Sequence, residues 1–302
     1  MGKERKISDW IIATRPWSFP ASTMPALVTI SYVYFLKNEI ASDINWFYGV
    51  LAFIGACIFQ ASGNLIGDYF DFKYGVDRKE SFGSSRMLVD RIFSPKTILN
   101  YGIIMLAIGI LLGLFLFVRT GTDLLWIGGI GVLATFFYYK LKFAAFGDLV
   151  IFIVYGPLIG LGTAFVMTNQ LIWNVVLLNI PIAFLVVNIL HANNMRDIRD
   201  DGKAHIRTQA MVLGMKRAKV QYLILAVGAY VGVILMVVFG MVHPLTLIVF
   251  LSLPVELKNL KQMKKAEVEN PELIKNLDAN SAQLVLIFSL LFAVANFFAA
   301  GL

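Results

Sequence analysis

The run ILNYGIIMLAIGILLGLFLFV, residues 98–118, contains no charged side chain and is apolar almost throughout. A helix needs roughly 20 such residues to cross the hydrocarbon core of a bilayer. Charged residues stand close to both borders of the run, with Lys96 before it and Arg119 after it. The run therefore predicts a transmembrane helix.

Similar apolar runs recur along the chain without the alternation that marks strands. Backbone groups in lipid must be hydrogen-bonded within their own segment, so we interpret these runs as helices. The last two runs before the final one are divided only by Gly240 and His243-Pro244. We predict an all-α integral membrane protein with about nine transmembrane helices, near residues 19–36, 48–67, 98–118, 122–139, 147–167, 172–195, 219–240, 242–256 and 282–301.

The composition supports this class. Of 302 residues, 58% are apolar and only 15% are charged, and the mean hydropathy is +0.74. A soluble domain of this size carries about 25% charged residues. The polar side chains are too few to cover a water-facing surface, so lipid must cover part of it.

The basic residues are concentrated on one side of the predicted membrane. If the amino terminus lies inside, every Lys and Arg except Lys37 and Arg119 falls in an inside segment. The positive-inside rule then predicts a cell-membrane protein with a cytoplasmic amino terminus and an external carboxyl terminus. The net charge of +7 needs no nucleic-acid partner to explain it, and no obligate protein partner is evident.

The chain is interpreted as one domain, residues 1–302. Residues 1–17 predict an interfacial segment, with Trp10 and Trp17 at headgroup depth. An Asp-rich helix end and a basic loop follow the second predicted span, and the same arrangement follows the sixth. This weak repeat indicates two four-helix halves and a ninth, closing helix, with cytoplasmic active-site loops at 68–96 and 197–218.

The first acidic cluster is NLIGDYFDFKYGVD, residues 64–77. Its members Asn64, Asp68 and Asp71 are spaced by four and three residues, which places them on one helix face. Only Lys73 and Arg78 stand near this cluster as neutralising cations.

The second acidic cluster is NNMRDIRDD, residues 193–201. Asn193, Asp197 and Asp201 share a stripe at spacing four, and Arg196 and Arg199 could offset part of its charge. Oxygen ligands without Cys or His suit a hard cation, and Mg²⁺ completes its shell with waters and substrate phosphates. The alternative is that both clusters are solvated helix ends. The candidate metal ligands are Asn64, Asp68, Asp71, Asn193, Asp197 and Asp201.

Basic residues flank both clusters. Arg and Lys side chains are suited to hold a diphosphate leaving group beside metal ions, although each of them alone could be a topology charge. The candidate diphosphate ligands are Arg78, Lys79, Arg86, Lys203, Arg207 and Thr208.

With these motifs, the chain resembles the UbiA superfamily of intramembrane prenyltransferases, most closely the branch that prenylates 1,4-dihydroxy-2-naphthoate. The resemblance covers nearly the whole chain from Arg15-Pro16-Trp17 onward. Residues 68–77 are similar to the branch motif D-Y-x-D-x-x-x-G-x-D, and residues 193–201 to N-N-x-R-D-x-x-x-D. The segment 146–163 and Arg207-Thr208 match further motifs.

The sequence departs from that branch in three places. Asp148 stands where the branch usually has Glu, His205-Ile206 replaces Gly-Lys, and Phe72 stands where the wider superfamily has Asp. These departures leave the metal chemistry intact and bear on the acceptor.

The resemblance implies nine helices around a central cavity that opens sideways to lipid. It implies an enzyme that transfers a prenyl chain from an isoprenyl diphosphate to an aromatic acceptor, a step of menaquinone synthesis. The cofactor would be Mg²⁺, as two or more ions that Mn²⁺ could replace. Catalytic roles then fall to Asp68, Asp71, Asp197 and Asp201.

Three further residues have two interpretations each. Tyr139 is a candidate to shield an allylic cation, or it is an interfacial tyrosine. Asp148 could contact the acceptor. We expect His191 to be packed or bonded to backbone rather than a catalytic base, whereas His205 could help to bind diphosphate.

Two other functions remain open from the residues. The same transfer could use 4-hydroxybenzoate, geranylgeranylglyceryl phosphate or haem as acceptor. A cation-coupled transporter would also place carboxylates in a membrane. The position of both clusters at one end of their helices, beside basic loops, favours chemistry on a phosphate.

Overall fold

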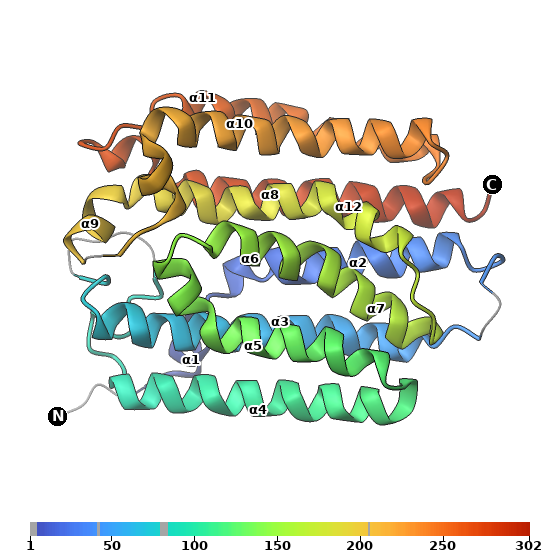
Figure 1. Ribbon diagram of the computed structural model, residues 1–302, viewed down its shortest axis with the longest axis horizontal. Coiled ribbons are helices and arrows are strands. Elements are labelled where there is room, and N and C mark those ends of the chain that lie inside the picture. Colours follow the sequence, from blue (N-terminus) through green and yellow to red (C-terminus); the bar gives the residue numbers. More distant parts are fainter. Residues whose placement is uncertain (1–4, 41–42, 79–83, 205) are drawn as a thin grey trace.

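The computed structural model describes residues 5–40, 43–78, 84–204 and 206–302. The longer helices in this part of the chain run side by side along the long axis of the molecule (Figure 1). The first described residues lie toward one end of the bundle, and the carboxyl terminus lies at the other (Figure 1). The elements are α1 (Ile7–Ala13), η1 (Pro16–Ser18), α2 (Pro20–Phe35), α3 (Trp46–Lys73), α4 (Pro95–Thr120), α5 (Asp123–Phe143), α6 (Gly147–Ile153), η2 (Val154–Leu158), α7 (Ile159–Thr168), α8 (Asn174–Arg196), α9 (Ile198–Lys203), α10 (Gln209–Val238), η3 (Pro244–Ser252), α11 (Leu253–Met263), η4 (Pro271–Ile274) and α12 (Leu277–Ala299).

Seven helical segments of the described chain are long and apolar enough to cross a membrane. Each coincides with a predicted span, and α6, η2 and α7 together form one of them. The predicted span 19–36 corresponds to α2, which has 16 residues, and the predicted span 242–256 is divided between η3 and α11. The chain is therefore an all-helical, multi-pass membrane protein.

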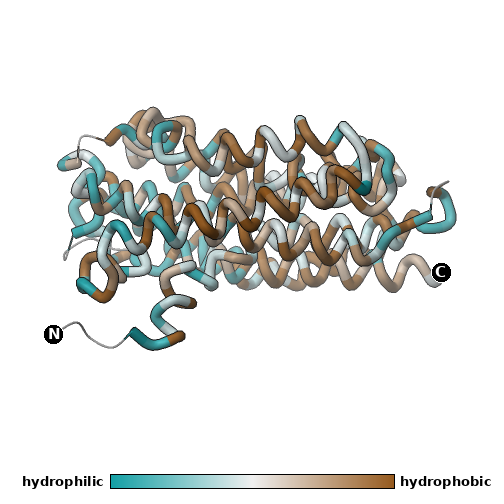
Figure 2. The backbone as a smooth tube through the Cα atoms, turned by 90° about the horizontal axis from the view of Figure 1, so that it is seen from below, coloured by the Kyte–Doolittle hydropathy of each residue, from teal (hydrophilic) through white to brown (hydrophobic). Residues whose placement is uncertain are grey.

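The outer surface of the bundle is apolar where lipid would contact it. On α4, Ile104, Leu111 and Val118 are exposed. Figure 2 shows hydrophobic residues along the middle of the molecule and hydrophilic ones mainly toward its two ends. An exposed apolar surface of this extent is expected against lipid tails rather than water.

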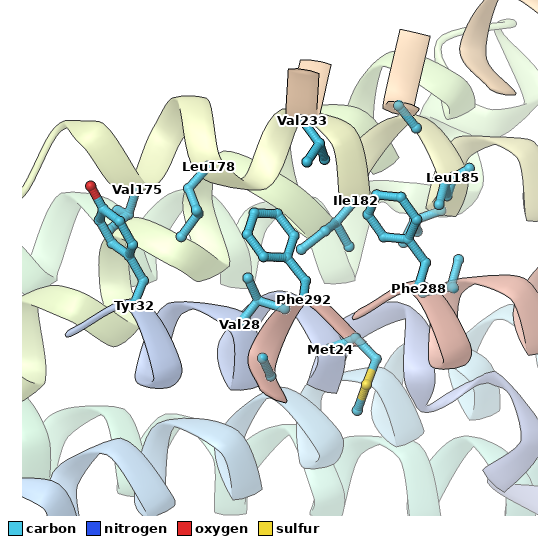
Figure 3. Packing of buried hydrophobic residues seen from close by; sticks show 14 of the residues in the cluster. Met24, Val28, Tyr32, Val175, Leu178, Ile182, Leu185, Val233, Phe288 and Phe292 are labelled. Carbon is cyan, nitrogen blue, oxygen red and sulfur yellow. The ribbon is translucent and has the colours of Figure 1, made fainter. Parts of the chain in front are cut away.

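The main hydrophobic core lies where α12 packs against α2 and α8. Figure 3 shows Phe292 of α12 between Val28 of α2 and Ile182 of α8, with Phe288 farther along α12. These four side chains are fully buried. The closing helix thus joins the first part of the chain to the second.

The fifth predicted span, residues 147–167, is irregular at its middle. Pro157 has no N–H to donate, and the helix widens into the π-turn η2 there. Gly156 lies so close to α8 that a Cβ atom at this position would collide with Ala183. This close approach holds the start of α6 beside the second half of α8, and the two elements pack together.

The predicted active-site loops are partly helical. Residues 68–73 belong to α3, and residues 198–203 and 209–218 belong to α9 and α10. The last turns of α3, α5 and α8 and the first turn of α6 lie at the same end of the bundle as α9 (Figure 1). Residues distant in sequence therefore meet at that end.

Candidate active site

A pocket at this end collects side chains from both acidic clusters, and we name it the acidic pocket. Carboxylates and amides line it together with two cations. Its lining residues are Arg15, Asp71, Val76, Asp77, Ser84, Lys142, Asn193, Asn194, Asp197, Asp200 and Asp201. The two clusters, which are more than a hundred residues apart in sequence, thus contribute to one site.

Asp68 is buried at the edge of this site rather than among its lining residues. Its Oδ1 forms a salt bridge with Arg15. Its Oδ2 accepts hydrogen bonds from Ser85 Oγ at 2.5 Å and from the Ser85 backbone N–H at 3.3 Å. The expectation that only Lys73 and Arg78 stand near the first cluster is therefore wrong.

Asp71 has a second unexpected partner. Lys142 Nζ, from the last turn of α5, donates to Asp71 Oδ2 at 3.1 Å. Lys73 Nζ instead lies over the rings of Tyr69 and Tyr74, 5.8 and 5.9 Å from their centroids. The cations that neutralise the first cluster come from elsewhere in the chain.

Asp77 enters the site because the chain reverses after α3. Gly75 adopts φ +71°, a left-handed conformation that ends a helix without a Cβ penalty. The Asp71 carbonyl oxygen then accepts from the N–H groups of Val76 at 2.8 Å and Asp77 at 3.2 Å. Burial, and then the charge of Asp71, raises the pKa of Asp77 to about 7.

The second cluster lies across a break between two helices. Helix α8 ends at Arg196, and Asp197 has a non-helical ψ of 7° before α9 begins. The Asp201 N–H still donates to the Asp197 carbonyl at 2.8 Å, which keeps both carboxylates at the pocket. Burial raises the pKa of Asp201 to about 7, although Lys142 opposes this shift; the charge of neighbouring Asp197 adds to it.

Arg196 neutralises this cluster, as the sequence indicates. Its guanidinium donates to Asp197 at 2.8 Å and to Asp278 of α12 at 2.7 Å, and it also bonds Asn193 Oδ1. Arg196 is buried, so these charge-assisted bonds are among the strong ones in the molecule. Asp278 was not among the residues predicted from the sequence.

The predicted diphosphate ligands are placed unevenly. Arg78 donates to the Asp200 carbonyl oxygen at 3.1 Å and so links the two loops. Arg86 pairs with Asp90 and Lys203 with Asp200, both at 3.1 Å. The Arg207 side chain is exposed, Thr208 is buried, and Lys79 and His205 lie outside the described residues.

Arg15 and Lys142 are the cations that line the acidic pocket, and sequence reasoning treated both as topology charges. The signal that could have identified them is their position. Each adjoins a predicted span at the end that carries the acidic clusters.

A larger cavity extends from the acidic pocket between the helices. It is bordered by η1, α2, α3, α5, α6, η2, α8 and α12, and shares Arg15, Asp71, Lys142 and Asn193 with the acidic pocket. Tyr139 lines this cavity and stacks on Phe70, with ring centroids 3.7 Å apart. The cavity thus joins aromatic and apolar walls to the charged site.

Asn64 lines the cavity rather than the acidic pocket. Its Nδ2 donates to the Thr14 carbonyl at 2.8 Å and to Ser18 Oγ at 2.9 Å, and its Oδ1 accepts from Gln60 at 3.3 Å. Through these bonds Asn64 holds residues 14–18 of the amino-terminal segment against α3.

Asp148 lines neither space. It is buried and accepts a hydrogen bond from Asn194 and from Gln221, and His191 contacts it. His191 is fully buried, and its Nε2 lies 3.0 Å from the Ala218 carbonyl oxygen. The prediction of a packed, backbone-bonded His191 is therefore confirmed.

The chemistry of the acidic pocket suits Mg²⁺. The lining side-chain atoms that could coordinate a cation are oxygens of Asp, Asn and Ser. Neither Cys nor His is among the lining residues. Within the described ranges, no three His, Cys, Asp or Glu side chains are arranged to hold an ion by themselves. Mg²⁺ requires only one or two carboxylates when phosphates and waters supply the other ligands. The donor set therefore fits Mg²⁺ bound together with a diphosphate.

Comparisons with known proteins identify the family of this chain. Residues 25–269 match the UbiA prenyltransferase family. The chain is 31% identical over 261 residues to 1,4-dihydroxy-2-naphthoate octaprenyltransferase of Bacillus subtilis (strain 168), covering 84% of this chain and 82% of that protein. It is 30% identical over 239 residues to UbiA prenyltransferase domain-containing protein 1 of Gallus gallus, covering 74% and 67%.

A solved structure shows the same fold. It is a UbiA homolog from Archaeoglobus fulgidus bound to GPP and Mg²⁺, and it aligns with a TM-score of 0.67. The alignment covers 97% of this chain and 100% of that one, at 16% sequence identity.

Proposed function

The chain belongs to the UbiA prenyltransferase family, and we propose that it transfers a prenyl chain from an isoprenyl diphosphate to 1,4-dihydroxy-2-naphthoate. The observation that carries the proposal is the continuity of two spaces. An acidic pocket suited to a metal diphosphate opens onto a cavity with aromatic and apolar walls, and four residues line both.

We assign the diphosphate end of the donor to the acidic pocket. Bound Mg²⁺ would neutralise the charge that develops on the departing diphosphate. Asp77 joins the set predicted from the sequence because it lines the same pocket. The residues proposed to hold Mg²⁺ are Asp71, Asp77, Asn193, Asp197 and Asp201, with Asn64 and Asp68 behind them as supports for the amino-terminal segment and Arg15.

Arg15 and Lys142 are proposed to bind the diphosphate directly. Both lie on the wall shared by the acidic pocket and the cavity, where the diphosphate joins the prenyl chain. Each is held by a carboxylate, Arg15 by Asp68 and Lys142 by Asp71. An anionic substrate can therefore exchange for these carboxylates as the partner of a cation that is already in place.

The cavity is proposed to hold the prenyl chain and the acceptor ring. Loss of diphosphate leaves an allylic cation, and the electron-rich ring attacks it at a nucleophilic carbon. That carbon then releases its own substituent, a proton or the carboxyl group as CO₂, and the ring regains its aromaticity. Tyr139 lines the cavity and stacks on Phe70 with the ring planes 11° apart, and its ring is proposed to stabilise the allylic cation. The apolar wall excludes water, which would otherwise capture the cation.

The choice of acceptor rests on the likeness to a naphthoate prenyltransferase and on the motifs around residues 68–77 and 146–163. A fused, electron-rich ring can attack an allylic cation without a strong base. Among the described cavity-lining residues there is no histidine to act as one. The transfer would then be a step of menaquinone synthesis.

We further propose nine membrane crossings within one domain, with α2 and the η3–α11 segment completing the seven longer spans. Lys and Arg are concentrated at the end that holds the acidic pocket. The positive-inside rule places that end and the amino terminus in the cytoplasm, and the carboxyl terminus outside.

The test is prenyl transfer by purified protein in detergent or liposomes. The assay contains Mg²⁺, radiolabelled prenyl diphosphates of several lengths, and three acceptors at equal concentration: dihydroxynaphthoate, 4-hydroxybenzoate and geranylgeranylglyceryl phosphate. We expect dihydroxynaphthoate to be prenylated fastest, and excess EDTA to abolish transfer. A preference for the glycerol phosphate would move the protein to lipid synthesis, and full turnover in EDTA would contradict the metal assignment.

A further inference from the structure

Asp148 lies at the centre of a buried hydrogen-bond network that joins α6, α8 and α10. Its Oδ2 lies 2.8 Å from His191 Nδ1 and accepts from Gln221 Nε2 at 3.0 Å. Its Oδ1 accepts from Asn194 Nδ2 at 3.2 Å. Asp148, His191 and Asn194 are 4% exposed or less, so water cannot replace these partners.

The network gives the Asn194 side chain a defined orientation. An amide has a donating and an accepting end, and a carboxylate can bond only the donating end. Because Nδ2 faces Asp148, Asn194 must direct Oδ1 elsewhere, and Asn194 lines the acidic pocket. No described residue donates a hydrogen bond to that oxygen.

His191 supports the carboxylate from a second side. Its Nδ1 lies 2.8 Å from Asp148 Oδ2. Its Nε2 faces the Ala218 carbonyl, which can only accept, so Nε2 carries a hydrogen and the ring is held between α6 and α10.

We propose that Asp148 is a positioning residue that fixes the amide of Asn194 with its oxygen toward the acidic pocket, where that oxygen serves the bound Mg²⁺–diphosphate. This inference rests on the proposed function. It replaces direct contact between Asp148 and the acceptor, since both carboxylate oxygens are occupied and the side chain lines neither space.

The effect on metal binding follows from the loss of orientation. Asp148→Asn keeps the shape of the side chain but allows the Asn194 amide to turn its NH₂ group toward the pocket. The hydrogens of an amide NH₂ group carry partial positive charge and its nitrogen lone pair is delocalised, so this group repels a cation where the amide oxygen would bind it. Residues that orient metal ligands typically change metal affinity by about 10–100-fold when they are removed.

The experiment measures thermal stabilisation of the purified, unreacted protein by Mg²⁺ in the presence of inorganic diphosphate. We expect Asp148→Asn to raise the half-saturating Mg²⁺ concentration by about tenfold or more. The KM for the acceptor, measured in the transfer assay at saturating Mg²⁺, should stay at the wild-type value. The matched control is Gln221→Met, which removes a donor to the other oxygen of the same carboxylate and should leave Mg²⁺ binding unchanged.

The decisive variant exchanges the two groups. In the double variant Asp148→Asn with Asn194→Asp, the amide at position 148 donates to one oxygen at position 194, and the second oxygen faces the pocket. We expect this exchange to restore Mg²⁺ binding to nearly the wild-type level, which a purely structural role for Asp148 would not predict. If Asp148→Asn alone does not fold, the double variant still tests the inference, because the inference requires it to recover both folding and Mg²⁺ binding.

Three results would overturn the inference. The first is an unchanged Mg²⁺ requirement in Asp148→Asn with a raised acceptor KM, which would return Asp148 to the acceptor. The second is an exchange variant that folds but binds Mg²⁺ as weakly as Asp148→Asn. The third is a wild-type protein with no Mg²⁺–diphosphate stabilisation, and this result alone would also overturn the proposed function.

Discussion

Lys142 Nζ lies 3.1 Å from Asp71 Oδ2, and this ion pair joins the last turn of α5 to the last turn of α3. Both side chains are largely buried, with 16% and 12% of their surface exposed. The pair lies on the wall between the acidic pocket and the cavity. A buried ammonium that has a single carboxylate partner in the described structure can change partner when an anionic substrate enters.

Replacing Lys142 by Met should weaken donor binding. Hydrogen bonds to charged groups contribute about 1.5–3 kcal/mol, so the half-saturating prenyl diphosphate concentration should rise by about tenfold or more. Steady-state kinetics with varied donor would measure it. Lys140→Met is the matched control, because Lys140 is exposed two residues away and lies over the Phe137 and Tyr139 rings. Equal effects of both variants would show that only the overall charge matters.

Asp68→Asn and Asp197→Asn should each reduce turnover by about a hundredfold or more while the protein still purifies as a folded species. Asp68 holds Arg15 at the shared wall, and Asp197 holds Arg196 and lines the acidic pocket. The transfer assay measures turnover, and elution on size-exclusion chromatography checks that each variant is folded. Asp90→Asn is the control, since Asp90 is exposed and pairs with Arg86 at the surface. Near wild-type activity in either variant would remove that cluster from the mechanism.

Mg²⁺ affinity should rise with pH between 6 and 8. Asp77 and Asp201 have pKa values raised to about 7, mainly by burial, and they line the same pocket. Below pH 7 each carboxyl is mostly protonated and must lose its proton before it can face a cation. The ionised fraction of one such group rises from about 0.1 at pH 6 to about 0.9 at pH 8. Calorimetric titration of Mg²⁺ with inorganic diphosphate at both pH values tests this, and an affinity that falls with pH would contradict it.

The same two groups predict that the metal-free protein loses stability as pH rises. A carboxyl whose pKa is higher in the folded state binds more protons folded than unfolded between pH 4 and 7, so the free energy of unfolding falls as pH increases through that window. We expect a higher melting temperature at pH 6 than at pH 8 in EDTA. Added Mg²⁺ and diphosphate should reduce this difference.

Glu256→Met should stabilise the protein. Glu256 is 2% exposed, and neither of its carboxylate oxygens has a hydrogen-bond partner in the described part of the chain. An unsatisfied buried polar group costs about 1–3 kcal/mol, and Met has a similar volume without that cost. Thermal unfolding would show a higher melting temperature. Glu272→Met, at an exposed residue paired with Lys275, should leave it unchanged. A lower melting temperature for Glu256→Met would mean that the carboxylate has an unrecognised partner.

Much of the fold could be predicted from local sequence. Seven predicted spans coincide with long apolar helices, and the division near Gly240 is real, since α10 ends at Val238 and Gly240 adopts φ +69°. The neutralising role of Arg196 was also predictable, because it adjoins Asp197 in the chain. Apolar runs and neighbours along a helix are properties of short segments, and they need no knowledge of packing.

The partners of the acidic residues were not predictable in this way. Arg15 lies 53 residues from Asp68, and Lys142 lies 71 residues from Asp71. Each contact depends on the rotation of two helices about their axes and on where each helix ends. Asp77 reaches the pocket only because the chain turns back at Gly75. Asp148 lies outside the cavity because α6 is packed tightly against α8.

The sequence by itself determined that this chain crosses a membrane as helices and that its carboxylates gather at one end, because hydrophobic length and helical spacing act locally. Only the tertiary structure decided which cation faces which carboxylate, and it showed that Asp148 bonds Asn194 rather than lining the cavity. The physical reason is that a charge buried between helices is stabilised by whichever group the packing places within hydrogen-bond distance, and residue order does not encode that distance.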